Sequence, residues 1–188
     1  VKPLVAQARE LQMPAIAVTD LANMFGLIKF YSEAESKGIK PICGCDVVIR
    51  GEDDRAETRL VLLAKHREGY LSLSRLISKI YTSDNARIDA SLSREQLEGE
   101  TEGLIALSGA QFSDVGAALL AGEAEQARAC LEYWRQLFPG SLYLEVQRVG
   151  RVDEEDYIDA AVELAAATDT PVVATNDVRF LQQEDFEA

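Results

Sequence analysis

The sequence predicts an α/β fold in which helices cover a parallel sheet that is either open or closed into a barrel. The main observation is that short, continuous apolar runs alternate with longer segments whose apolar residues recur at helical spacing. In addition, a chain of 188 residues is long enough to bury a sizeable core. Its 47% hydrophobic and 27% charged residues are typical of a globular protein.

The first half of the chain follows this alternation from its opening segment, where Val5, Ala8 and Leu11 share one helix face. A second helix is expected to end at Gly38, because glycine is a common helix C-cap. The predicted helices are therefore the opening segment, 25–37 and 67–83, and the predicted strands are 15–19, 39–49 and 60–63. A charged turn is expected at 51–57.

The second half continues the pattern after a polar link at 84–90. Ser93 and Gln96 have the spacing of a capping box, which predicts a short helix. Acidic residues from Asp153 onward favour a helix start, since the helix dipole stabilises negative charge there. Further helices are predicted at 113–120, 123–137 and 153–167, and further strands at 104–107, 142–146 and 171–175.

The net charge and the cysteine content indicate which kinds of binding partner and which cellular compartment to expect. The net charge of −13 repels phosphate backbones, so this segment is not expected to be a main DNA-gripping surface. No apolar run approaches the roughly 20 residues that span a bilayer. Three cysteines without a signal peptide indicate a reducing, cytoplasmic setting. Cys43 and Cys45 would share one face of a strand, either as a metal-binding pair or as small packed residues.

Candidate chemistry lies at the carboxyl ends of the predicted strands, where polar residues line the site in such folds. Asp20, Asp46 and Asp177 follow or lie within apolar runs, and converging carboxylates can hold divalent cations. His66 is the only histidine, which excludes a three-histidine metal site within this chain. The sequence contains no G-x-S-x-G, G-x-G-x-x-G or Walker A motif. The residues alone therefore predict an α/β domain with a polar pocket.

Several segments together resemble one family. These are Ala17-Val18-Thr19-Asp20-Leu21-Ala22-Asn23-Met24-Phe25-Gly26-Leu27, Gly38 to Asp46, Lys65 to Leu73, Leu107-Ser108-Gly109, and Pro171 to Phe180. In order and spacing they resemble the polymerase-and-histidinol-phosphatase (PHP) domains of bacterial DNA polymerase III alpha subunits. The resemblance covers nearly the whole chain.

The resemblance implies a distorted (β/α)7, TIM-like barrel formed by residues 1–188 as a single PHP domain fragment. The chain begins with Val1 inside a predicted helix and ends in an acidic segment. The resemblance further implies that the first strand, with its His-x-His pair, would precede Val1, so that the barrel would be truncated. The polymerase palm, fingers and thumb would follow this chain. Mg²⁺ is expected only in that absent polymerase part, and no cofactor is expected in this domain.

At most positions where metal-binding members of the family carry a metal ligand, this chain carries a different residue. Leu21, Arg59, Val149 and Arg179 stand where those members carry histidine, Asp46 stands where they carry glutamate, and Arg148 stands where they carry aspartate. With Asp20 and Asp177, the resemblance implies that these eight positions are a vestigial metal pocket, in which we expect no intact set of metal ligands and no catalytic residue. An acidic pocket without its metals is unstable unless another cation neutralises it. We therefore hypothesise that Arg59 and Arg179, with Arg148 as a further candidate, pair with Asp20, Asp46 and Asp177; the alternative is that these arginines point to solvent.

The resemblance implies a parent protein that is a DNA-directed DNA polymerase, a nucleotidyltransferase of DNA replication in the bacterial cytoplasm. The fragment itself would be a non-catalytic platform that docks the proofreading exonuclease (epsilon) subunit within the polymerase III holoenzyme. One alternative is a metal-dependent phosphoesterase, acting as a second proofreading nuclease or a pyrophosphatase. Another is an unrelated (β/α) enzyme that uses Asp20, Asp46 and Asp177 with one magnesium ion.

Overall fold

The computed structural model describes residues 1–51, 57–82 and 90–181. Its strands are β1 (Ala15–Leu21), β2 (Lys40–Ile49), β3 (Thr58–Ala64), β4 (Ser91–Leu92), β5 (Leu104–Leu107), β6 (Leu142–Gln147) and β7 (Val172–Thr175). Its helices are α1 (Lys2–Glu10), α2 (Leu27–Ser36), α3 (Arg67–Thr82), α4 (Arg94–Leu97), α5 (Asp114–Leu120), α6 (Ala124–Leu137) and α7 (Glu154–Thr168), with a 3-10 turn, η1 (Ala110–Phe112). The predicted alternation of strands and helices is therefore present.

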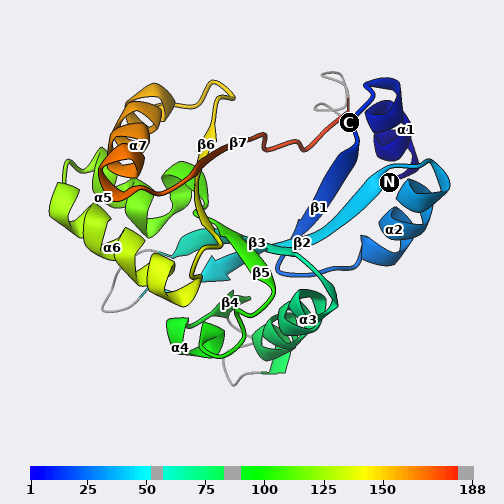
Figure 1. Cartoon of the computed structure of the whole chain (residues 1–188), viewed down its shortest axis with the longest axis horizontal. Coiled ribbons are helices and arrows are strands. Elements are labelled where there is room, and N and C mark those ends of the chain that lie inside the picture. Colours follow the sequence, from blue (N-terminus) through cyan, green and yellow to red (C-terminus); the bar gives the residue numbers. More distant parts are fainter. Residues whose placement is uncertain (52–56, 83–89, 182–188) are drawn as a thin grey trace.

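One curled sheet organises the molecule and forms a half-barrel with helices outside it (Figure 1). The strand order is β1-β2-β3-β5-β6-β7, and the short strand β4 pairs with β2. Strands β1 and β7 form the two ends of this path, so among the described residues each pairs with one neighbour only. The α/β class predicted from the sequence is confirmed, and the sheet has the curvature of part of a barrel.

The sheet is mixed, which corrects the prediction of a parallel sheet. Strand β3 runs antiparallel to both β2 and β5, whereas the pairs β1–β2, β5–β6 and β6–β7 are parallel. The reason is the short connection from Ile49 to Thr58, which is too brief for a crossover helix. A direct connection turns the chain back and reverses β3. The charged turn predicted at 51–57 lies mostly outside the described residues, as does the polar link at 84–90.

The main core lies between the outer face of the sheet and the helices that cover it. Leu60 and Leu62 of β3 pack in the same cluster as Leu73 and Leu76 of α3, and Trp134 of α6 is 2% exposed. Burying one such leucine contributes roughly 1.5–3 kcal/mol relative to leaving it in water. A second cluster joins α1 to α2. The outer helices are thus fixed by apolar packing, which leaves the inner face for polar residues.

The backbone of helix α3 also lies directly against the backbone of the turn before β5, with no side chain between them. A methyl group built on Gly69 would lie 2.0 Å from the carbonyl oxygen of Gly103. This close approach places the start of α3 directly against the turn that leads into β5. No helix among the described residues is both long enough and apolar enough to span a membrane.

Candidate functional site

The inner face of the half-barrel brings together polar side chains from β2, β3, β6 and the segment after β7. A cavity of about 30 Å³ lies among them. It is lined by Asp46, Arg59, Val61, Gly109, Phe112, Glu145, Gln147 and Asp177. The space is comparable to one water molecule. The candidate site is therefore a nearly filled cluster of carboxylates and guanidinium groups.

Asp46 and Arg59 form a two-pronged pair across the antiparallel strands β2 and β3. Arg59 Nε donates to Asp46 Oδ1 at 3.3 Å, and Arg59 Nη2 donates to Asp46 Oδ2. Strand register places Val48 opposite Arg59, so the guanidinium reaches diagonally to Asp46 on the same face. Burial raises the pKa of Asp46, although the charge and hydrogen bonds of Arg59 act in the opposite direction. The guanidinium of Arg59 therefore balances the negative charge of the Asp46 carboxylate, which is largely removed from water.

Asp177, which follows β7, is held by two arginines. Arg151 Nη2 donates to Asp177 Oδ2 at 2.5 Å, and Arg179 Nε donates to Oδ1 at 2.8 Å. Partial burial acts to raise the pKa of Asp177, but hydrogen bonds and charge from Arg179 and Arg151 outweigh it and lower that pKa. Arg151 also donates to Gln147 Oε1 at 2.7 Å and lies over the Phe112 ring. Arg151 thus connects the β6–α7 loop to the segment after β7.

Glu145 is a buried carboxylate at the centre of the site, 3% exposed, which the sequence reasoning missed. Its Oε2 accepts from the Gly109 backbone N–H at 3.1 Å, and its Oε1 accepts from Thr175 Oγ1 and Gln147 Nε2. These donors come from the end of β5, from β7 and from β6 itself. A glutamate inside the otherwise apolar run 142–146 was the signal that could have revealed it, because a charge there must find internal partners.

Asp20 and Leu21 lie at the end of β1, beside the pairs just described. Asp20 Oδ2 accepts from the Gly26 backbone N–H at 3.1 Å. Both residues line a groove of about 830 Å³ that also contains Asp46, Asp177 and Arg179. Leu21 is 49% exposed. The structure therefore brings Asp20 to the same side of the sheet as the other two aspartates, while its hydrogen-bond partner is the backbone.

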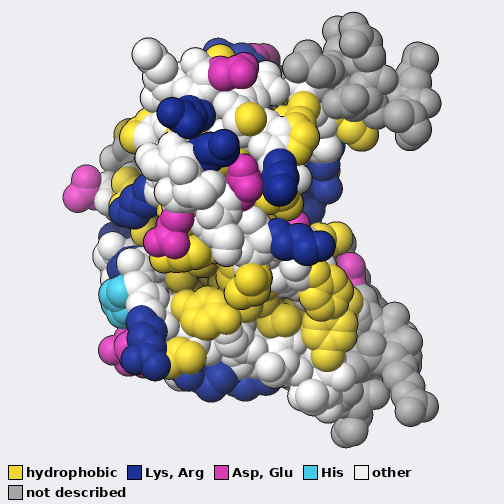
Figure 2. Space-filling model, turned by 90° about the vertical axis from the view of Figure 1, so that its right-hand side faces the viewer, with side chains coloured by type: hydrophobic (Ala, Val, Ile, Leu, Met, Phe, Trp, Pro, Cys, Tyr) yellow, Lys and Arg dark blue, Asp and Glu magenta, His cyan; other side chains and the backbone are white. Residues whose placement is uncertain are grey.

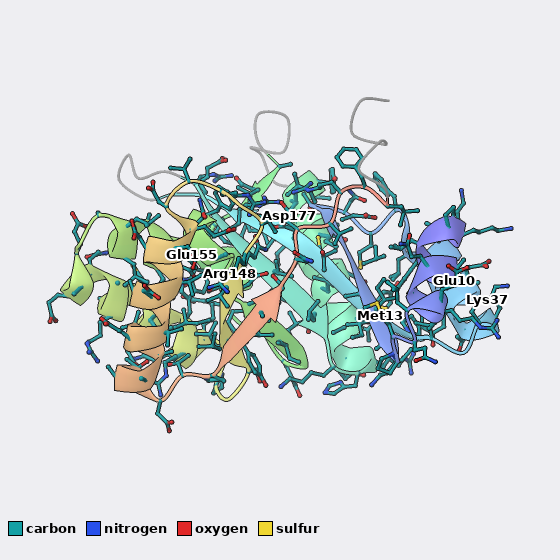
Figure 3. All side chains as sticks on the ribbon, turned by 90° about the horizontal axis from the view of Figure 1, so that it is seen from above. Glu10, Met13, Lys37, Arg148, Glu155 and Asp177 are labelled. Carbon is teal, nitrogen blue, oxygen red and sulfur yellow. The ribbon has the colours of Figure 1, made fainter. Side chains whose placement is uncertain are left out.

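Arg148 and Val149 lie away from the aspartates, which corrects the expectation for Arg148. Arg148 Nε and Nη2 donate to the two carboxylate oxygens of Glu155 on α7 at 2.7 and 2.9 Å. Figure 3 shows these two side chains beside each other at the α7 side of the molecule. Val149 is 42% exposed. The loop 148–151 turns so that Arg151, three residues later, reaches Asp177 in place of Arg148.

Glu154 explains how this loop is held. Its Oε2 accepts from the backbone N–H groups of Val149 and Gly150, both at 2.8 Å. These hydrogen bonds lower the pKa of Glu154, against the opposing effect of burial. Gly150 has a φ of +84°, in the region that glycine adopts readily. One carboxylate at the start of α7 therefore fixes the turn from which Arg151 extends.

The residues present do not fit the metal centre of metal-binding family members. Leu21 and Val149 offer no donor atom, and the guanidinium groups of Arg59, Arg151 and Arg179 already occupy oxygens of Asp46 and Asp177. Within the described ranges, no three His, Cys, Asp or Glu side chains are grouped as metal ligands. Burial raises the pKa of Cys45 to about 12, which disfavours the thiolate that binds metals. His66 is exposed at the start of α3.

Comparisons with known proteins identify the family. The model of the PHP domain family matches residues 1–149. The chain is 47% identical to DNA polymerase III subunit alpha of Pseudomonas aeruginosa over 189 residues, 44% identical to that of Vibrio cholerae, and 45% identical to that of Escherichia coli K12 over 187 residues. These alignments cover 99–100% of this chain and 16% of each relative, so the chain spans about a sixth of their length.

A solved structure from Bifidobacterium adolescentis, assigned as a metal-dependent phosphoesterase, is also similar. Its TM-score is 0.49 at 13% sequence identity, and the match covers 92% of this chain and 80% of that one. The family model matches more than half of the chain, and the relatives are more than 40% identical over nearly all of it. This chain therefore belongs to the PHP domain family, and over its whole length it is similar to DNA polymerase III alpha subunits.

Proposed function

We propose that this chain is the PHP domain of a bacterial replicative DNA polymerase, a polymerase III alpha subunit, and that it acts there as a non-catalytic structural domain. The observation that carries this proposal is the replacement of metal-ligand chemistry by arginine–carboxylate pairs. Arg59 occupies both oxygens of Asp46, and Arg151 and Arg179 together occupy those of Asp177. Mg²⁺ would serve the polymerase part of such a subunit, and this domain would need no cofactor.

The physical reason is charge balance in a poorly hydrated pocket. The side chains of Asp46 and Asp177 are 15% and 25% exposed, and Glu145 is 3% exposed. Such clustered carboxylates repel one another unless a cation lies among them. A guanidinium supplies that charge and matches the planar geometry of a carboxylate. Arginines from β3, the β6–α7 loop and the segment after β7 would therefore stabilise the pocket without a bound ion.

We further propose that the half-barrel is completed into a distorted (β/α)7 barrel by one more strand between β1 and β7. Both strands have an open edge among the described residues, and the groove of about 830 Å³ lies between them. An open edge presents backbone N–H and C=O groups that favour pairing with a further strand. In the proposed subunit, this strand would come from outside residues 1–188.

The proposed partner of the domain is the proofreading exonuclease subunit of the same bacterial replicase. Support comes from the similarity to polymerase III alpha subunits and from the net charge of −13, which favours a protein partner over direct contact with DNA. This assignment predicts that the full-length subunit loses affinity for the exonuclease when residues 1–188 are deleted. Unchanged affinity after the deletion would contradict it.

Metal content tests the non-catalytic role. The chain is incubated with excess manganese or zinc, dialysed, and measured by elemental analysis. We expect a stoichiometry near zero for the natural chain. A matched variant, Arg59→His with Arg179→His, should retain more zinc, because imidazole groups would then stand beside Asp46 and Asp177. One or more tightly held ions in the natural chain, together with phosphoesterase activity, would overturn the proposal in favour of a metal-dependent phosphoesterase.

A further inference from the structure

A second cavity lies on the side of the molecule away from α1 and α2. Figure 2 shows the α1–α2 side, where hydrophobic side chains gather in the lower part of the surface. On the other side, where α5 and α6 lie (Figure 1), a cavity of about 750 Å³ is bounded by the ends of β2 and β3 and by η1, α5 and α6. We call it the α5–α6 cavity. Its volume lies within the roughly 300–1,000 Å³ range of small-molecule sites.

The α5–α6 cavity is distinct from the site among the arginine–carboxylate pairs. The two cavities share Arg59 and Phe112 in their walls, and their other lining residues differ. The small cavity is nearly filled, with space for about one water molecule. The α5–α6 cavity is therefore the larger of the two spaces and the one that can hold a ligand.

Arg50 supplies a positive charge to this cavity and is held in place by β4. Its backbone N–H donates to the carbonyl oxygen of Leu92 at 2.7 Å, and its Nη2 donates to Oγ of the fully buried Ser91 at 3.3 Å. Arg50 is half-buried, and among the described residues no carboxylate pairs with it, although the chain has 32 acidic and 19 basic residues. A half-buried guanidinium without an ion-pair partner favours an anionic ligand.

The other charged side chains of the cavity do not take the place of such a ligand. Two further arginines line it, and each pairs with an aspartate, namely Arg59 with Asp46 and Arg94 with Asp114. Glu57 and Glu123 also line the cavity, but both are exposed, so water and salt screen their charges. The half-buried charge of Arg50 is therefore the one that an anion would meet.

The opposite wall suits a flat ring. Phe112 is 43% exposed, and the guanidinium of Arg151, 5.1 Å from the ring centroid, does not line the cavity. The rest of the Phe112 ring is therefore open to the cavity, and aromatic rings of this kind stack on nucleobases. Gln126 of α6 donates to Cys130 Sγ at 3.5 Å, and because sulfur is a weak acceptor its amide remains available to the edge of a base.

We propose that the α5–α6 cavity binds a mononucleotide, with its phosphate at Arg50 and its base against Phe112. A guanidinium matches the geometry of a phosphate and forms charge-assisted hydrogen bonds with it. Ala117 and Ala118 of α5 also line the cavity, and their small side chains leave room for the ligand. This site goes beyond the proposed structural role, since a non-catalytic domain and a catalytic one could both hold such a ligand.

Photoaffinity labelling of the full-length protein tests the site. The probe is 8-azidoadenosine monophosphate, which forms a covalent adduct under ultraviolet light, and labelled peptides are mapped by mass spectrometry. Mapping separates this cavity from any nucleotide site elsewhere in the full-length protein. We expect saturable labelling of peptides from η1, α5 and α6, with half-saturation below about 1 mM. Adenosine monophosphate should compete with the probe.

Three variants show which contacts hold the probe. Arg50→Gln should raise the half-saturating concentration about tenfold, because the phosphate would lose a charge-assisted partner. The matched control Arg148→Gln removes the same charge from the exposed pair with Glu155 and should leave labelling unchanged. Ala117→Leu narrows the cavity at an exposed position and should also weaken labelling. Thermal unfolding of each variant confirms that the fold is retained.

Three results would overturn the proposal. These are the absence of label within residues 1–188, equal half-saturation for the natural chain and Arg50→Gln, and equal labelling by 8-azidoadenosine, which lacks the phosphate. DNA synthesis and metal content are measured on the same preparations. Normal synthesis without label in this chain contradicts the mononucleotide site alone, whereas tightly bound metal contradicts the proposed function and leaves the labelling result to be judged by itself.

Discussion

At the scale of single residues, the site depends on which arginine reaches which carboxylate. Arg59 and Arg148 both form two hydrogen bonds with one acidic side chain. Their surroundings differ, however. The side chains of the Arg59–Asp46 pair are 28% and 15% exposed, and those of the Arg148–Glu155 pair are 70% and 64% exposed. Water screens exposed charges. The Arg59–Asp46 pair should therefore contribute to stability, and the Arg148–Glu155 pair should contribute little.

Substituting Arg59→Gln should destabilise the chain by about 1–3 kcal/mol, because Asp46 would lose its charged partner while staying largely buried. The matched control Arg148→Gln should leave the urea midpoint nearly unchanged, as expected for an exposed pair. Equilibrium unfolding in urea measures both. If the two variants unfold at the same urea concentration, Arg59 does not compensate Asp46. A double-mutant cycle with Asp46→Asn would then show no coupling.

Glu154 should be the residue that keeps Arg151 in place. The substitution Glu154→Gln replaces the charged acceptor of two backbone N–H donors by a neutral one, which should weaken both hydrogen bonds and loosen the turn. The control Glu155→Gln removes only the partner of exposed Arg148. The amide proton signals of Val149 and Gly150 in NMR spectra should shift in the first variant alone. Equal shifts in both variants would contradict a specific role for Glu154.

At the scale of elements, packing decides where each helix lies. Trp134 of α6 donates its indole N–H to Asp114 at the start of α5, and Arg94 at the start of α4 donates to the same carboxylate at 2.8 Å. Arg94 also lies over the rings of Tyr133 and Trp134. One carboxylate thus joins three helices, which explains why the short helix α4 is ordered by more than its own capping box.

The contact between Gly69 and Gly103 predicts a large effect from a single methyl group. Gly69→Ala should destabilise the chain by about 3 kcal/mol, because α3 would have to move away from the turn before β5. Ser74→Ala, at a half-buried position of the same helix away from Gly103, should stay within about 0.5 kcal/mol of the natural chain. Thermal unfolding of both variants measures the difference. A stability of Gly69→Ala equal to that of Ser74→Ala would mean that the helix adjusts without loss.

The elements were predictable from the sequence because apolar periodicity reports directly on buried faces. The capping box at Ser93 and the helix start at Asp153 were likewise predicted within a residue. The direction of β3 was not, because the pattern of a buried strand is the same in either direction. Strand β4, with two residues, is too short to carry a pattern. Local sequence signals therefore predict where helices and strands lie, but they do not predict the direction and pairing of every strand.

The site could be predicted only in part for a related reason. Asp46 and Asp177 were predictable because each lies within or follows an apolar strand, whereas Arg59 and Arg179 were identified only through the family resemblance. Arg151 was not, since its contact with Asp177 spans 26 positions and depends on the turn at Gly150. Glu145 was overlooked although its place within an apolar strand was visible. A single sequence does not reveal long-range contacts, such as that of Arg151 with Asp177, that depend on the shape of a loop.

At the scale of the whole molecule, acid should destabilise the fold because Asp177 becomes protonated and loses its charge interactions with Arg151 and Arg179. Its pKa is lowered in the folded state, so its contribution to stability is present above the ordinary value of 3.8 and is lost as the pH falls through the folded pKa. Asp46 has the opposite sign, because its raised pKa favours the protonated form in the folded state. The two effects are separable by substitution.

We therefore expect the stability difference between the natural chain and Asp177→Asn to be constant above about pH 5 and to shrink below the ordinary carboxyl pKa. The corresponding difference for Asp46→Asn should change in the opposite direction as the pH falls. Urea unfolding at a series of pH values measures both curves. A difference for Asp177→Asn that does not vary with pH would show that its pairs with Arg151 and Arg179 do not contribute.

The arginine pairs also have a consequence for how the protein depends on its surroundings. A metal centre must be loaded after synthesis, competes with other proteins for scarce ions and is emptied by chelators. Guanidinium groups are built into the polypeptide and are present in every copy as soon as the chain folds. A domain that holds its inner pocket together with Arg59, Arg151 and Arg179 should therefore stay intact during manganese or zinc starvation.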